Sequence, residues 1–156
     1  MRIAIGSDHA GYMLKTEIAR WLVAQGYEVR DWGTDNAEDS VDYPDFARAV
    51  AQAVATRECD LGIALCGTGI GVSITANKVP GVRAAVCTDT YMARMSRQHN
   101  NANVLCLGGR VLGVGLALDI VAAWLTAAFE GGRHARRVAK YEPLEAQTSK
   151  LKACKG

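Results

Sequence analysis

Five short apolar runs alternate with stretches of helical periodicity along almost the whole chain. The apolar runs span residues 2–6, 27–32, 60–65, 82–87 and 103–107. The stretches predicted as helices span residues 10–25, 44–56, 71–78, 90–98 and 114–130, and a last helix begins near Arg133. Short apolar strands separated by helices are typical of a parallel sheet that is covered on both faces. The sequence therefore predicts a Rossmann-like, three-layer α/β/α fold around a five-stranded parallel sheet.

Length and composition indicate a single globular domain of ordinary size. The 156 residues are 49% hydrophobic and 22% charged, as in average soluble proteins, and suffice for a substantial core. We expect one domain over residues 1–146 and a frayed tail over residues 147–156, where little can be buried. The net charge of +2 gives no reason to expect nucleic acid as a partner.

Apolar runs and cysteines indicate the compartment. The longest apolar stretch, residues 114–129, contains Asp119 and Thr126 and is too short for a membrane span, so no membrane partner is expected. The first residues lack the long apolar run of a signal peptide. The five cysteines form no Cys-x-x-Cys pair and have no metal-ligand spacing with histidine. These features predict a location in the reducing cytoplasm.

A glycine-rich hexapeptide, residues 66–71, follows the third apolar run and precedes a predicted helix. Its glycines allow a sharp turn that brings bare backbone N–H groups close to a ligand. Cys66 would therefore combine a thiol with main-chain donors, which suits a proton-transferring base beside an oxygen that becomes negative. A cysteine at a strand end is more often buried and inert, but Thr68 and the glycines favour the reactive thiolate. The spacing fits neither the dinucleotide-binding motif nor the P-loop.

Two more polar loops follow predicted strands. Parallel sheets bind ligands at the carboxyl ends of their strands, so residues 7–9, 66–71 and 108–110 should converge on one crevice. Asp8 and His9 could hold sugar hydroxyls or a phosphate, and Asp8 could equally cap the helix that follows. Arg110, which comes directly after two glycines, is a candidate phosphate ligand.

The last third of the chain adds a histidine and a basic segment. His99 and Asn100 precede the fifth predicted strand. An imidazole titrates near neutrality and could serve as the acid that opens a sugar ring, although a loop histidine is more often merely solvated. Arg133 and Arg137 are four residues apart and share one helical face, so they could grip a phosphate. A solvated basic helix is the alternative interpretation.

Together these segments resemble the type B ribose-5-phosphate isomerases, which are grouped with the galactose-6-phosphate isomerase subunits. The resemblance extends from residue 2 to about residue 146 and rests on residues 6–11, 42–44, 66–71, 76–78, 96–100, 108–110 and 130–134. One branch of this family uses a glutamate in the glycine loop as its base. Here Val72 occupies that place and Cys66 is present, which indicates the cysteine branch.

The resemblance implies a metal-free and cofactor-free enzyme that interconverts D-ribose 5-phosphate and D-ribulose 5-phosphate in the pentose phosphate pathway. It also implies a homodimer with its active sites at the subunit interface. By motif, Cys66 is the base and His99 the ring-opening acid, and Thr68 is placed among the catalytic residues. The residues expected to bind substrate are Asp8, His9, Tyr43, Gly67, Thr68, Gly69, Ile70, Gly71, Asn100, Arg110, Arg133 and Arg137.

Other functions remain open at this point. The nearest is an isomerase for a six-carbon substrate such as allose or galactose 6-phosphate, which the pocket length near Tyr43 and residues 34–42 would decide. A non-catalytic sugar-phosphate sensor on the same fold is a second, but binding alone needs neither Cys66 nor His99. A redox role for Cys66 is a third, and no resolving cysteine is close in sequence.

Overall fold

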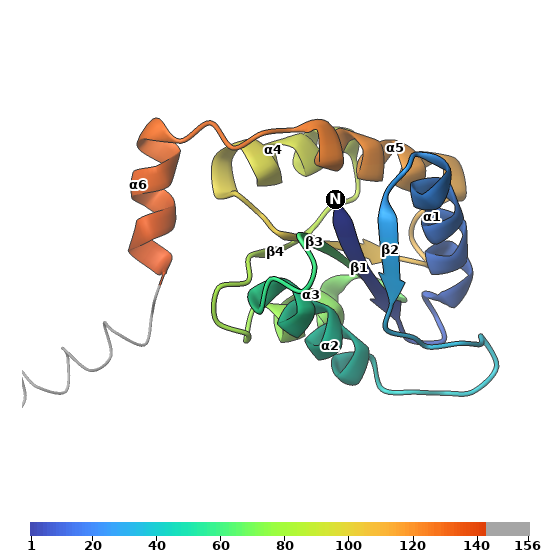
Figure 1. Cartoon of the computed structure of the whole chain (residues 1–156). Coiled ribbons are helices and arrows are strands. Elements are labelled where there is room, and N and C mark those ends of the chain that lie inside the picture. The colour runs from blue at the N-terminus through green and yellow to red at the C-terminus, as the bar shows by residue number, and fades with distance from the viewer. Residues whose placement is uncertain (143–156) are drawn as a thin grey trace, which may run out of the picture.

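A computed structural model of the chain describes residues 1–142 and contains one parallel sheet with helices on both faces (Figure 1). Residues 143–146 of the predicted domain and the predicted tail, 147–156, lie outside the described residues. The strands are β1 (Arg2–Ser7), β2 (Glu28–Asp31), β3 (Leu61–Cys66), β4 (Ala84–Val86) and β5 (Val104–Gly108). The helices are α1 (Tyr12–Ala24), α2 (Tyr43–Ala55), α3 (Ile70–Ala76), α4 (Thr90–Asn100), α5 (Val114–Thr126) and α6 (Gly132–Tyr141). The predicted three-layer fold is confirmed.

The two faces of the sheet carry side chains of different size. On β1, Ile3 and Ile5 face the layer formed by α1, α4 and α5, whereas Ala4 faces α2 and α3. The strands β3 and β5 repeat this alternation, with leucine or isoleucine on the first face and alanine, valine or cysteine on the second. The small residues let α2 approach closely, since a methyl group at Gly62 would lie only 2.8 Å from Val50. The small-residue face is also the face that carries Cys66.

The order of the strands, β2-β1-β3-β5-β4, places a crevice at one edge of the sheet. The chain leaves β1 through α1 to reach β2, and then returns through α2 to β3 on the other side of β1. These two connections lie on opposite faces of the sheet, so the chain leaves β1 toward one face and leaves β3, through α3, toward the other. Such a switch in direction is where open parallel sheets bind ligands, at the carboxyl ends of the strands.

Some element boundaries differ from the predicted ones. The helix predicted over residues 114–130 ends at Thr126, because Ala127 adopts an extended conformation, so its predicted end is wrong. The apolar periodicity continues past this point and gave no signal for the end. The strand predicted over residues 82–87 is shorter, with only Ala84–Val86 paired to β5.

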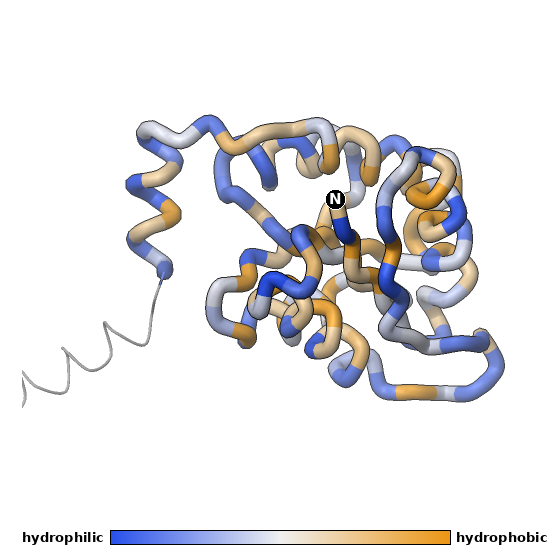
Figure 2. The backbone as a smooth tube through the Cα atoms, in the orientation of Figure 1, coloured by the Kyte–Doolittle hydropathy of each residue, from blue (hydrophilic) through white to orange (hydrophobic). Residues whose placement is uncertain are grey.

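The last helix, α6, stands apart from the sheet. It follows an extended segment and Gly131, whose φ is +67°, and among the elements its principal packing is against α4. The tube of α6 is mostly hydrophilic, in contrast to the more apolar α5 that precedes it (Figure 2). No helix within residues 1–142 is both long and apolar enough to span a lipid bilayer.

The buried cysteines outside the glycine loop are packed as core residues. The sequence predicts Cys87 and Cys106 as small buried thiols, and both are almost fully buried. Burial raises the pKa of Cys87 to about 11 and raises that of Cys106 as well. Both thiols are therefore protonated and unreactive near neutral pH.

Candidate active site

The three loops predicted to converge are bonded to one another by their backbones. The N–H of Asp8 donates to the carbonyl of Leu65 at 3.4 Å, which joins the loop after β1 to β3. The N–H of Gly109 donates to the carbonyl of Cys66 at 2.8 Å, and the N–H of Arg110 to that of Gly67 at 3.0 Å. The carboxyl ends of β1, β3 and β5 therefore form one framework, and the predicted convergence is confirmed.

A pocket of about 430 Å³ opens at this framework. It is lined by Asp8, Tyr43, Cys66, Gly67, Thr68, Ile70, Gly71 and Ile74. All of these except Ile74 were predicted as site residues. The signal for Ile74 was available, because it lies one helical turn after Ile70 and thus on the same side of α3.

The Cys66 thiol is buried but faces this pocket, and its side chain has a main-chain donor. The N–H of Gly69 donates to Sγ at 3.2 Å. This geometry requires Gly69, whose φ is +80°, a conformation that side chains disfavour. An added methyl group there would also lie 3.0 Å from the backbone of Leu107. The sharp turn that brings N–H groups to the thiol therefore depends on a residue without a Cβ.

Close packing around the glycine loop also places Tyr43 and Arg110. A methyl group at Gly71 would lie 2.6 Å from the Tyr43 ring, so the ring packs directly on the backbone of the loop. At Gly67 a methyl group would lie 3.5 Å from Cδ of Arg110, which brings the start of this side chain beside the pocket. The loop thus borders both an aromatic ring and an arginine.

Asp8 does not cap α1, whose N-cap is Gly11 without a side-chain hydrogen bond, but it lies in the turn just before this helix. One carboxylate oxygen accepts from the N–H of Gly11 at 3.0 Å in the turn before α1, and the residue also lines the pocket. His9 does not line the pocket. Its Nδ1 accepts from the N–H of Val41 at 3.2 Å, so a neutral His9 carries its proton on Nε2. His9 thereby fastens the polar loop before α2 next to the site.

The remaining predicted residues lie away from the pocket. The helix α4 runs back from the carboxyl end of β4 and ends at Asn100, four residues before β5 begins. His99 and Asn100 therefore lie near the amino edge of the sheet, whereas Cys66 ends β3 at the carboxyl edge. Arg133 and Arg137 are exposed on α6. One chain alone does not bring these four residues to Cys66.

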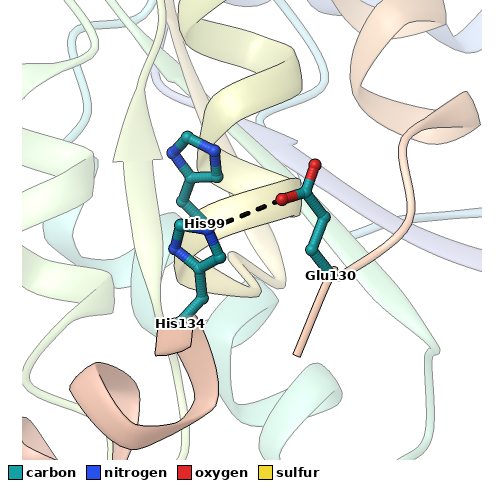
Figure 3. Close-up of side chains that lie close together, drawn as sticks. All are labelled: His99, Glu130 and His134. Carbon is teal, nitrogen blue, oxygen red and sulfur yellow. Dashed lines mark ion pairs between the residues drawn. The ribbon is translucent and has the colours of Figure 1, made fainter. Parts of the chain in front are cut away.

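His99 belongs to a second cluster, with Glu130 and His134 (Figure 3). The imidazole rings of His99 and His134 stack with centroids 4.1 Å apart and planes within 4° of parallel. The Glu130 carboxylate lies 3.5 Å from Nε2 of His134. Burial, and then the neighbouring His99, lower the pKa of His134, which favours its neutral form. Glu130 and His134 lie within one of the motif segments, residues 130–134, but neither was predicted to have a role in the site.

The same three residues carry atoms of the kinds that bind metal ions. One ligand atom from each of the three residues lies within 4.8 Å of the others. The lone pairs of an imidazole lie in the plane of its ring, and the two planes here are parallel and stacked. The two rings therefore cannot direct lone pairs at one ion without leaving the stack. The present arrangement instead suits a role for His134 in holding the His99 ring.

The chain is similar in sequence to one known protein family over almost all of its described residues. The model of the ribose/galactose isomerase family matches residues 3–141. Ribose-5-phosphate isomerase B of Escherichia coli is 54% identical, over 92% of this chain and 96% of that protein. D-erythrulose-4-phosphate isomerase of Pectobacterium atrosepticum is 47% identical, over 94% and 97%.

The structural comparison agrees with the family match. The structure of Clostridium thermocellum ribose-5-phosphate isomerase B superposes with a TM-score of 0.92 and 64% identity, over 95% of this chain and 99% of that one. The carboxyl-edge pocket and the family match over nearly the whole described chain lead to one conclusion. The chain belongs to the ribose/galactose isomerase family, is an isomerase, and resembles in sequence and fold its type B ribose-5-phosphate isomerases.

Proposed function

We propose that the chain interconverts D-ribose 5-phosphate and D-ribulose 5-phosphate through an enediolate, as a step of the pentose phosphate pathway. The names of relatives at 54% and 64% identity support this substrate. The observation that carries the proposal is the Cys66 thiol in a pocket whose wall is a turn of main-chain N–H groups. An aldose–ketose exchange needs a base beside a C–H bond and donors beside the oxygen that becomes negative.

The glycine loop supplies both kinds of group. Cys66, as the thiolate, removes the proton from C2 of the open-chain sugar and returns it at C1, so the reaction needs no metal or redox cofactor. The N–H of Gly69 stabilises the thiolate, and other loop N–H groups stabilise the enediolate oxygen. Loss of one such donor typically costs about 2.7–4 kcal/mol of transition-state stabilisation.

Thr68 and the polar groups around the loop orient the sugar. The Thr68 hydroxyl oxygen accepts from the N–H of Ile70 at 3.3 Å, which leaves its own hydrogen to donate to a sugar oxygen. Asp8 accepts hydrogen bonds from sugar hydroxyls, and Tyr43 lines the sugar pocket. His9 holds the neighbouring loop in place through its hydrogen bond with Val41. Arg110 binds the phosphate. Such positioning of a non-reacting group holds C1 and C2 against the thiol.

A second copy of the chain completes this site in a homodimer. His99, as the ring-opening acid, and Asn100 lie near the amino edge of their own sheet, and Arg133 and Arg137 extend from a helix that stands apart. Beside the Cys66 pocket, Ile70 and Ile74 expose more than half of their surface. Apolar side chains exposed at a pocket favour coverage by another protein surface. A partner chain placed there would bring its His99 and arginines to the sugar.

A substrate of different length is the second candidate. The relative named D-erythrulose-4-phosphate isomerase is 47% identical to this chain, which supports a four-carbon sugar phosphate. The six-carbon phosphates expected as alternatives need more room beyond Tyr43. The compartment proposed is the cytoplasm, supported by four buried cysteines that are free thiols among the described residues.

A coupled assay of the purified chain in the presence of EDTA tests the proposal. Ribose 5-phosphate, erythrulose 4-phosphate, allose 6-phosphate and galactose 6-phosphate are compared in parallel. We expect kcat/KM to be highest for ribose 5-phosphate, by about tenfold or more over the others. A higher value for another sugar phosphate contradicts the substrate, and loss of turnover in EDTA contradicts the metal-free mechanism.

A further inference from the structure

The amino edge of the sheet holds a cavity of about 610 Å³ that is larger than the Cys66 pocket and separate from it. Its wall is formed where β1, β3 and β5 begin and where α2 and α4 end. None of the residues predicted for the isomerase site lines it. Its volume lies within the usual range of small-molecule sites, about 300–1,000 Å³.

The charge of this cavity is strongly positive. Four arginines line it, Arg2, Arg57, Arg83 and Arg97, against one acidic residue, Asp60. Asp60 is already occupied, because it forms a 3.0 Å ion pair with Arg2 and accepts from the Arg2 backbone N–H at 2.7 Å. Arg83 is paired with Glu142, which does not line the cavity. The anionic groups present therefore neutralise two of the four guanidinium groups.

The other two guanidinium groups have no carboxylate partner within the described residues. Arg97 is the more informative of the two, since it is partly buried against the ring of Trp124, 5.6 Å from the ring centroid. One Nη donates to the carbonyl of Ala102 at 2.6 Å, but its buried Nε has no acceptor within residues 1–142. Burial, and then the charge of Arg83, lower the pKa of Arg97.

Buried charges are normally paired, and an unpaired one is costly. A planar guanidinium group matches phosphate oxygens in two-point hydrogen bonds better than it matches other common partners. Asn101 lines the same wall and adds an amide group for a sugar hydroxyl. The Asn103 amide, in contrast, is hydrogen-bonded to the backbone of Arg83 and Gly81. We propose that this amino-edge cavity binds a phosphate-bearing small molecule, at a site distinct from the Cys66 pocket and held chiefly by Arg57 and Arg97.

Equilibrium binding of radiolabelled inorganic phosphate at low ionic strength tests this site. The wild-type chain should bind phosphate at two classes of site, the Cys66 pocket and the amino-edge cavity. Excess D-ribose 5-phosphate should displace phosphate more readily from the Cys66 pocket. In the Arg57→Gln, Arg97→Gln double variant, the class that resists displacement should weaken about tenfold or more, as expected for loss of charged hydrogen bonds. Isomerase kcat and KM should stay at wild-type values, because neither arginine belongs to the proposed active site.

Two single variants serve as a control and as a milder test of the same site. Arg48→Gln removes an exposed arginine from the outer face of α2 and should leave both classes of phosphate binding unchanged. Arg57→Gln alone leaves the Arg97 contact with Trp124 intact, so it should fold normally and still weaken the second class. A single class of phosphate site in the wild type, fully displaced by the sugar phosphate, overturns the proposal. Equal binding by Arg57→Gln and Arg48→Gln overturns it as well.

Discussion

The two edges of the sheet hold the two halves of the predicted site in contrasting ways. At the carboxyl edge, backbone hydrogen bonds tie three loops together, and glycines pack against their neighbours without room for a methyl group. Near the amino edge and on α6, His99 is held by a stacked ring, and Arg133 and Arg137 are exposed. The first half is a preformed pocket that contains the proposed base, and the second consists of the proposed acid and the exposed arginines. Under the proposed function the two halves complement each other, and they would meet between two chains.

The largest effect is expected from removing the base at the carboxyl edge. Cys66→Ala should lower kcat by about 10²–10⁴-fold, the usual contribution of general base catalysis. The fold should be retained, because only one small group is lost. Cys59→Ala is the matched control, since Cys59 is equally buried but lies outside the pocket. Near-normal turnover by Cys66→Ala in the coupled assay would remove it as the base.

Distorting the preformed loop should have the next largest effect. Gly69→Ala forces a side chain into a φ of +80° and against the backbone of Leu107. We expect a loss of about 1–3 kcal/mol in the free energy of unfolding, together with a lower kcat. Gly26→Ala is the control, because Gly26 has a φ of +85° but open space around it. Equal losses in chemical denaturation of the two variants would contradict the tight packing described for the loop.

Substitution of exposed arginines on α6 tests the half of the site that lies away from the Cys66 pocket. Arg137→Gln should chiefly raise KM for the phosphorylated sugar, by about tenfold, because one charged hydrogen bond to phosphate is lost. Arg136→Gln removes a neighbouring exposed arginine from a different side of the helix and should leave KM unchanged. Initial-rate kinetics give the KM of both variants for comparison with the wild type. An unchanged KM in Arg137→Gln would exclude this residue from phosphate binding.

The smallest effect concerns the pH dependence of stability near the stacked histidines. The pKa of His134 is lowered in the folded chain, so the unfolded state binds the proton more readily. Stability from this group is therefore present above the unfolded pKa of about 6.5 and is lost as pH falls from that value through the lower folded pKa. His134→Gln should lose less stability than wild type between about pH 7 and pH 5 in thermal unfolding. Identical pH profiles would contradict the burial of a neutral His134.

The sequence was sufficient to predict the carboxyl-edge half of the site, for a clear physical reason. The strands are short and apolar and each is followed by polar residues, so a parallel sheet places the loops after β1, β3 and β5 at the same edge. Motif resemblance then identified Cys66, Thr68 and Tyr43, all of which line one pocket. The order of the strands cannot be predicted from local sequence patterns, and only the structure shows it.

The second half of the site was harder to place from sequence. His99 and Asn100 were found by motif, but their location depends on the direction in which α4 crosses the sheet. The end of α5 was also missed, because residues 127–130 continue the chain without a strong break before Gly131. The stacking of His134 on His99 joins α6 to α4, a tertiary contact that no spacing along the chain encodes.

Mixing two inactive variants tests most directly whether the two halves meet between chains. Cys66→Ala and His99→Asn are each purified, mixed, unfolded and refolded together, and assayed with ribose 5-phosphate. If each site takes its base from one chain and its acid from the other, one intact site forms in every mixed dimer, and about a quarter of wild-type activity should return. Variants refolded separately and then combined just before the assay provide the baseline. Activity that stays at this baseline, although mixed dimers are shown to form, would contradict a site shared between two chains.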